Sequence, residues 1–92
     1  MGSRTVDVTN PLGLHARAAA RFVHAASDFE ADITVAHGNR TVDGKSIMGL
    51  LLLAAPQGAR LAIQASGSDA EAALERLSGL VTSGFSEDGW NG

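Results

Sequence analysis

The sequence predicts an α+β domain in which one mostly antiparallel sheet carries helices on one face and water on the other. Three observations lead to this prediction. The chain has 92 residues, the length of one ordinary domain. Apolar and polar residues alternate in four short segments, as in strands that are buried on one face. Elsewhere apolar residues recur every three to four positions, as on one face of a helix. The predicted order is β-α-β-β-α-β-α, with four strands and three helices.

The first predicted strand and helix are separated by a turn. Residues Thr5–Thr9 alternate, so that Val6 and Val8 share one face, as in a half-buried strand. The run Asn10–Gly13 contains Pro and Gly and predicts a turn. The period changes over Ala16–Ala26, which predicts a helix. The apolar face of this helix consists of Ala19, Phe22, Val23 and Ala26.

A β-hairpin is predicted in the middle of the chain. Residues Asp32–His37 alternate, so that Ile33 and Val35 point inward. The pair Gly38–Asn39 is typical of a two-residue hairpin turn, and it leads into a short strand over Arg40–Val42.

Two helices and one strand are predicted in the second half. Ser46 precedes the apolar run Ile47–Leu53, whose Leu and Met content favours a helix capped by Ser46. Residues 60–65 alternate and predict the fourth strand. The pattern Ser68-x-x-Glu71 predicts a capping box at the start of the last helix. The apolar face of that helix consists of Ala70, Ala73, Leu74, Leu77 and Val81.

We expect a single domain over residues 1–92, with an ordered core over about 4–84 and a polar tail over 85–92. The composition of this domain excludes several classes of function. The net charge of −3 argues against nucleic-acid binding, which needs a basic surface. The absence of cysteine excludes a disulfide scaffold and a thiolate metal site. No run of about 18 apolar residues could span a membrane, and the start lacks the apolar region of a signal peptide. These features predict a cytoplasmic protein.

Two other classes share features with this chain. RNA-recognition domains have the same β-α-β-β-α-β order, but they need aromatic residues on exposed strands. The aromatic residues here all lie outside the predicted strands: Phe22, Phe29, Phe85 and Trp90. A metal enzyme needs clustered ligands, and the three histidines lack that spacing. We therefore expect no metal and no cofactor; the histidines are His15, His24 and His37.

His15 lies just before the first predicted helix, where Ser, Thr, Asp or Asn normally caps the N–H groups. A poor cap costs a helix about 1 kcal/mol. A bound anion can offset this loss because a helix N-terminus attracts negative charge. Arg17 adds a guanidinium that can bind an anion with two hydrogen bonds. An imidazole, N–H groups and an arginine together are typical of a phosphoryl acceptor. The alternative is an ordinary loop histidine beside a surface arginine.

The helix predicted after Ser46 is more apolar than packing against a sheet requires. Such a helix needs one apolar stripe, and a second stripe usually marks a partner site. Met also suits a surface that meets several partners. The alternative is a fully buried helix. We expect Leu50, Leu53 and Ala54 to face the core, and Ile47, Met48 and Leu51 to lie on the other side.

Ser46 admits a regulatory interpretation in addition to its role as an N-cap. A phosphate on its hydroxyl would lie at the positive end of the helix dipole and would not unfold the helix. It would place a charge of about −2 at the edge of the apolar patch. That charge could block a partner while the fold stays intact.

Two motifs carry a family resemblance: Leu12–Arg17 (LGLHAR) and Gly44–Gly49 (GKSIMG). They resemble the two signatures of HPr, the histidine-containing phosphocarrier family of the bacterial phosphotransferase system. The resemblance runs from about Thr5 to Phe85 and includes the order of the elements. It implies an open-faced β-sandwich with a four-stranded antiparallel sheet and three helices on one face.

The resemblance also implies a phosphoryl relay. His15 would accept a phosphoryl group on a ring nitrogen from enzyme I, which obtains it from phosphoenolpyruvate, and would pass it to an enzyme IIA-type domain. The Arg17 side chain and the backbone N–H groups of Ala16 and Arg17 would stabilise the group. Ser46 matches the site that an HPr kinase/phosphorylase modifies in many relatives. The chain would be a monomeric carrier and not an enzyme by itself. The implied docking residues are Ala20, His24, Ile47, Met48, Leu51 and Leu52.

Two positions depart from the family pattern. Ala18 stands where many members have Pro, and Leu52 stands where a smaller polar residue is frequent. Leu52 therefore enlarges the apolar patch. The run of residues 15–19 looks more like the proteobacterial members, including the nitrogen-branch phosphocarrier. The alternative function is a regulatory protein that signals through phosphorylation-dependent binding without sugar transport, and only its acceptor proteins would discriminate the two.

Overall fold

The computed structural model describes residues 2–85, which form seven elements in the predicted order. Within this range, no helix has the length and apolar character that crossing a membrane requires. The elements are β1 (Gly2–Asp7), α1 (Ala16–Ala26), β2 (Asp32–His37), β3 (Arg40–Asp43), α2 (Ile47–Leu53), β4 (Arg60–Ser66) and α3 (Ala70–Thr82).

The four strands form one antiparallel sheet in the order β1-β4-β2-β3. β4 is paired on both sides, with Ile63 opposite Arg4 of β1 on one side and opposite Val35 of β2 on the other. The hairpin pairs β2 with β3, and His37 lies opposite Arg40. The predicted fold class is therefore confirmed.

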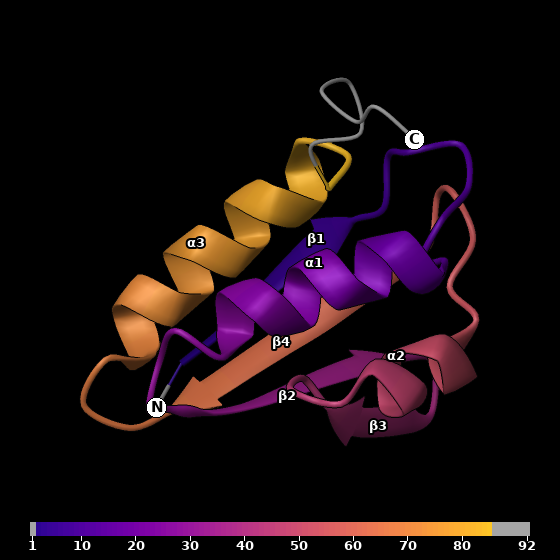
Figure 1. Cartoon of the computed structure of the whole chain (residues 1–92). Helices are drawn as coiled ribbons and strands as arrows, with labels where there is room; N and C mark the ends of the chain where they lie inside the picture. Colours follow the sequence, from indigo (N-terminus) through magenta and orange to yellow (C-terminus); the bar gives the residue numbers. More distant parts are fainter. Residues whose placement is uncertain (1, 86–92) are drawn as a thin grey trace.

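One face of the sheet is covered by helices and the other is open. On β4, Leu61 and Ile63 are buried, while Gln64, the next residue along the strand, is exposed. α1 and α3 lie side by side over the sheet, with α3 against β1 and β4 (Figure 1). α2 contacts α1 and the β2–β3 hairpin. The core between these layers includes Phe22 and Leu50.

The ends of the packed region differ slightly from the expectation. β1 begins at Gly2 because Gly2 and Ser3 pair with Ala65 and Gln64 of β4. Phe85, expected at the start of the polar tail, is instead buried, and its N–H donates a hydrogen bond to the carbonyl oxygen of Leu80 at 2.8 Å. The rest of the expected tail, residues 86–92, lies outside the described residues.

The predicted capping box at the start of α3 is wrong. The N-cap is Asp69 rather than Ser68, and the Asp69 side chain makes no capping hydrogen bond. Its two carboxylate oxygens instead accept hydrogen bonds from the backbone N–H groups of Glu30 and Ala31, both at 2.9 Å. The N–H of Glu30, more than any other group, lowers the pKa of the Asp69 carboxyl because it favours the ionised form. Asp69 thus ties α3 to the segment that leads into β2.

Candidate functional site

The loop before α1 is held against the segment that follows α2. Gly13 has a φ of 67°, and a side chain there would place its Cβ 2.5 Å from the carbonyl oxygen of Ala55. The N–H of Leu14 donates to that same oxygen at 2.8 Å. The side-chain amide of Asn10 donates to the carbonyl oxygen of Gly13 at 2.8 Å. These contacts fix the backbone that enters α1 at His15.

His15 is the N-cap of α1, with extended backbone at φ −85° and ψ 178°. Its Nδ1 accepts a hydrogen bond from the backbone N–H of Arg17 at 3.3 Å. The expectation that His15 is a poor cap is therefore wrong, because the imidazole itself supplies the acceptor. An accepting Nδ1 carries a lone pair, so the proton of the neutral ring is on Nε2. The lone pair of Nδ1 is therefore directed toward the first turn of the helix.

The first turn of α1 favours negative charge. This turn lies wholly within the described residues and contains no acidic side chain, so no carboxylate there offsets the positive end of the helix dipole. Ala16 and Arg17 are both exposed and follow His15 directly. A group bound at Nδ1 would therefore lie beside backbone N–H groups and one guanidinium side chain. This arrangement suits a phosphoryl group.

Ser46 is the N-cap of α2, as predicted. Its Oγ accepts a hydrogen bond from the N–H of Gly49 at 3.0 Å, and the residue is half-buried. Gly49 packs closely against this cap, since a Cβ there would lie 3.3 Å from Oγ of Ser46 and 3.2 Å from Cβ of Val42. The neighbouring Lys45 is anchored by its Nζ, which donates to the carbonyl oxygen of Phe29 at 2.7 Å. The hydroxyl thus lies at the positive end of α2.

The apolar residues of α2 divide between the core and the surface. Leu50 and Leu53 are buried, as expected. Ala54 was expected to face the core but is exposed, because it ends the helix in a left-handed conformation with φ 50°. Leu51 was expected at the surface but is half-buried and packs against the core. The surface apolar residues, with their exposed fractions, are Leu12 (70%), Ile47 (42%), Met48 (69%) and Leu52 (61%).

Leu12 is the exposed apolar residue that the sequence analysis missed. It lies in the loop that packs against Ala55, directly before Gly13. The sequence does indicate its exposure, since an apolar residue between Pro11 and Gly13 in a turn serves no packing role there. The exposed apolar surface therefore includes the loop that carries His15.

The remaining predicted docking residues lie on the exposed side of α1. Ala20 and His24 are both exposed, and both line a groove between α1 and α3. His37, in contrast, lies at the end of β2, where its Nδ1 is 3.3 Å from the carbonyl oxygen of Arg60. His37 therefore belongs to the sheet and not to the His15 site.

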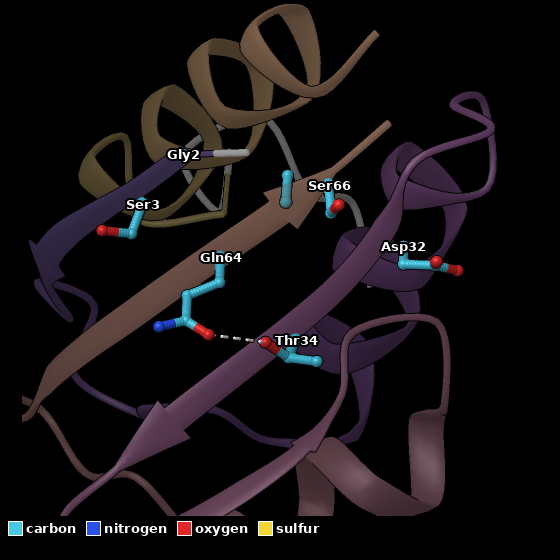
Figure 2. Close-up of a pocket in the computed structure, with 7 residues that line it drawn as sticks. Gly2, Ser3, Asp32, Thr34, Gln64 and Ser66 are labelled. Atoms are coloured by element: carbon cyan, nitrogen blue, oxygen red, sulfur yellow. Dashed lines mark hydrogen bonds between the residues drawn. The ribbon is translucent and has the colours of Figure 1, made fainter. Parts of the chain in front are cut away.

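A separate hollow of about 340 Å³ lies on the open face of the sheet. Thr34 and Gln64 meet across its floor, with 3.5 Å between Oγ1 and Oε1 (Figure 2). The predicted site residues all lie elsewhere. Its lining consists of Gly2, Ser3, Asp32, Thr34, Gln64, Ala65 and Ser66.

Comparisons with known proteins identify the family. Residues 2–83 match the family model described as "PTS HPr component phosphorylation site". The phosphocarrier protein HPr of Xylella fastidiosa is 46% identical over 83 residues, which are 90% of this chain and 93% of the relative. The phosphocarrier protein NPr of Shewanella violacea is 40% identical over 84 residues, 91% of this chain and 92% of the relative.

A solved structure agrees with these sequence matches. The crystal structure of HPr-C-His from Thermoanaerobacter tengcongensis superimposes with a TM-score of 0.90 and 42% identity, covering 95% of this chain and 98% of that one. The class of the protein is therefore a phosphocarrier of the phosphotransferase system. Within that class, the chain belongs to the HPr family.

Proposed function

We propose that Nδ1 of His15 accepts a phosphoryl group from phosphorylated enzyme I, charged by phosphoenolpyruvate, and passes it to an enzyme IIA-type domain. The observation that carries this proposal is the hydrogen bond from the Arg17 N–H to Nδ1, which leaves that nitrogen unprotonated. The bond between Nδ1 and phosphorus forms while the bond between phosphorus and the donor breaks. No proton has to leave Nδ1, so the chain needs no general base of its own.

The first turn of α1 stabilises the phosphorylated state. The phosphoryl group brings about two negative charges to the positive end of the helix. The Arg17 N–H that bonds Nδ1 in the resting state then donates to a phosphoryl oxygen, and so does the N–H of Ala16. The Arg17 guanidinium binds the outer oxygens. The phosphate thus replaces the imidazole as the acceptor that caps α1, and the helix still begins at the same residue.

The exposed apolar residues form the docking surface for both partners. Met48 and Leu52 are the most exposed of the predicted members on α2, and Ile47 lies beside them. Leu51 contributes its outer edge, while Ala20 and His24 extend the surface along α1. A small apolar surface around one charged centre supports brief, weak complexes, as a relay requires. The chain acts as a monomer in the cytoplasm, where phosphoenolpyruvate is made.

Ser46 is the regulatory site in this proposal. Phosphorylation by an HPr kinase/phosphorylase would place about −2 charge at the start of α2, directly before Ile47 and Met48. The phosphate is compatible with the helix because it lies at the positive dipole end. Its charge opposes docking of any partner that already carries a phosphoryl group.

A second candidate function is regulation through a nitrogen-type phosphotransferase system. The 40% identity to the NPr of Shewanella violacea favours it. The chemistry at His15 would be the same, and the phosphorylated chain would signal by binding partners without sugar transport. Mixing the phosphorylated chain with sugar-type and nitrogen-type IIA domains separates the two functions by which domain gains the phosphoryl group.

The deciding experiment is the intact mass of the chain after incubation with enzyme I and phosphoenolpyruvate. One phosphoryl group should appear and should be lost in mild acid, as expected for a phosphorus–nitrogen bond. His15→Ala should remain unmodified, whereas His37→Ala serves as the matched control and should be modified like the wild type. Modification of His15→Ala, or no modification of a folded wild type by active enzyme I, would refute the proposal.

A further inference from the structure

The hollow on the open face of the sheet has a floor whose order follows from the strand register (Figure 2). Ser3, Gln64 and Thr34 form one row across β1, β4 and β2, because Gln64 lies opposite both of the others. Asp32 and Ser66 lie opposite each other in the next row, two residues along the strands. Alternate residues of a strand share a face, so these five side chains point to the side away from the helices.

One hydrogen bond divides this floor into an accepting side and a donating side. The hydroxyl of Thr34 donates to Oε1 of Gln64, with 3.5 Å between the two oxygens. A hydroxyl has a single hydrogen, so Oγ1 of Thr34 presents only lone pairs to a molecule that enters the hollow. Nε2 of Gln64 keeps two hydrogens, and it points away from Thr34 (Figure 2). The hollow therefore accepts hydrogen bonds on its β2 side and donates them on its β1 side.

Asp32 gives the accepting side a negative charge. The residue is exposed and lines the hollow, and within residues 2–85 its carboxylate has no ion-pair partner. None of the described residues that line the hollow is cationic. A phosphate or carboxylate ligand would therefore be repelled with no cation to compensate. An ammonium group, in contrast, has three N–H donors for the carboxylate and the neighbouring hydroxyls.

We propose that this hollow binds a small hydroxylated amine, of which an amino sugar is an example. The ammonium group bonds to the carboxylate of Asp32 and to the hydroxyls of Thr34 and Ser66. A hydroxyl oxygen of the same ligand accepts a hydrogen bond from Nε2 of Gln64. The volume of about 340 Å³ lies in the range of small-molecule sites. The site is separate from the phosphoryl site, because α1 and His15 lie on the helical side of the sheet.

The test titrates the isotope-labelled full chain with glucosamine at slightly acidic pH, where the amine is protonated. Saturable chemical-shift changes are expected at the side-chain amide of Gln64 and at the backbone amides of Thr34 and Ser66. The dissociation constant should be about 1 mM or weaker, because an open site encloses little of its ligand. Glucose has the same ring with a hydroxyl in place of the amine, and it should bind roughly tenfold more weakly. The phosphate ester of glucosamine should also bind more weakly, since it adds an anion.

Three variants locate the binding, and circular dichroism checks the fold of each. Asp32→Asn removes the charge and keeps the shape, so glucosamine binding should weaken roughly tenfold while glucose binding stays the same. Thr34→Val removes the hydroxyl but keeps a β-branched side chain that suits a strand, and it should also weaken glucosamine binding. Asp43→Asn is the matched control. It removes the same charge from β3, opposite Thr34 but outside the hollow, and should bind glucosamine like the wild type.

The outcomes separate this inference from the phosphocarrier function. Equal affinities for glucosamine and glucose, or shifts that do not saturate, would overturn the inference. Equal weakening in Asp32→Asn and Asp43→Asn would show attraction by the charge of the whole sheet face, and would overturn it as well. His15→Ala should bind glucosamine like the wild type, because His15 lies on the other side of the sheet. Phosphoryl uptake by the wild type is measured without the amine, so its failure would refute the proposed function alone.

Discussion

The backbone N–H of Arg17 donates to Nδ1 of His15 across 3.3 Å, so the imidazole that caps α1 does so through the same nitrogen that we propose as the phosphoryl acceptor. Nδ1 of His15 thus has a structural role as the helix cap and a proposed chemical role as the phosphoryl acceptor. Substitutions at this position can separate the two contributions, because some side chains cap a helix and cannot accept a phosphoryl group.

His15→Ala should lower the free energy of unfolding by about 1 kcal/mol, the cost of a lost N-cap. His15→Asn should restore most of that stability, because the Asn side chain caps as well as any other. Neither variant should gain phosphoryl mass. Urea unfolding gives the stabilities, and equal stability of the wild type and His15→Ala would argue that the imidazole contributes no cap.

Ser46→Asp should slow phosphoryl uptake from enzyme I and leave the fold unchanged. Asp caps a helix as well as Ser, so α2 keeps its start. The added negative charge repels the phosphorylated donor, and the effect should weaken at high salt. Ser68→Asp adds the same charge at an exposed position before α3 and should have little effect. Equal rates for the wild type and Ser46→Asp at low salt would count against the electrostatic account.

Met48→Ser should raise KM for enzyme I while changing the stability by no more than about 0.5 kcal/mol, because Met48 is exposed. Leu50→Ser, two residues further along the same helix, should cost more than about 2 kcal/mol because Leu50 is buried. Steady-state transfer and urea unfolding measure the two effects. A docking role for Met48 would be ruled out by an unchanged KM.

Asp69→Asn should flatten the acid limb of the stability curve. The folded state lowers the pKa of Asp69 below its ordinary value of 3.8, chiefly through the N–H of Glu30. The ionised carboxylate therefore stabilises the fold above about pH 4, and this contribution is lost as the pH falls through the lowered folded pKa. Unfolding is measured between pH 2 and pH 7. Asp28→Asn corrects for the general change in charge, and an acid limb as steep in Asp69→Asn as in that control would disprove the linkage.

Gly13→Ala should destabilise the chain more than Gly38→Ala. Both glycines have positive φ, at 67° and 62°, so each substitution costs about 1 kcal/mol for the strained backbone. Gly13 is also pressed against Ala55 and Pro56, whereas a Cβ at Gly38 would meet nothing within 4 Å. The difference between their unfolding free energies measures the close contact. Equal destabilisation would mean that the loop before His15 can shift freely.

Elements whose structure depends only on residues close together in the chain are predictable from the sequence. The change of period at Ala16 and the Ser46 cap depend on neighbouring residues, so the predicted α1 and the predicted start of α2 are correct. The predicted cap of α3 failed because it depends on distant partners. The sequence pattern assigns the cap of α3 to Ser68 because the bonds from Asp69 to Glu30 and Ala31 cannot be inferred from local spacing.

The candidate site divides in the same way. His15 and Arg17 are two residues apart, and this short spacing is enough to indicate an anion site. The groove between α1 and α3 is not predictable from the sequence. Arg21 and Arg76 both line it, but they come together only when α3 packs beside α1. The position of Leu51 was predicted wrongly because its contacts come from the core around α2, which helical spacing alone does not specify.

The strand order β1-β4-β2-β3 has a consequence for biosynthesis. β1 precedes the other described elements along the chain, but within residues 2–85 its only partner in the sheet is β4, which pairs Leu61 with Val6. During translation, β1 therefore cannot pair with β4 until α1, the β2–β3 hairpin and α2 have been synthesised. The closing of this long loop makes the last strand pairing the entropically costly step. In a nascent chain that stalls before β4, the backbone N–H and C=O groups of β1 lack their partners in the sheet.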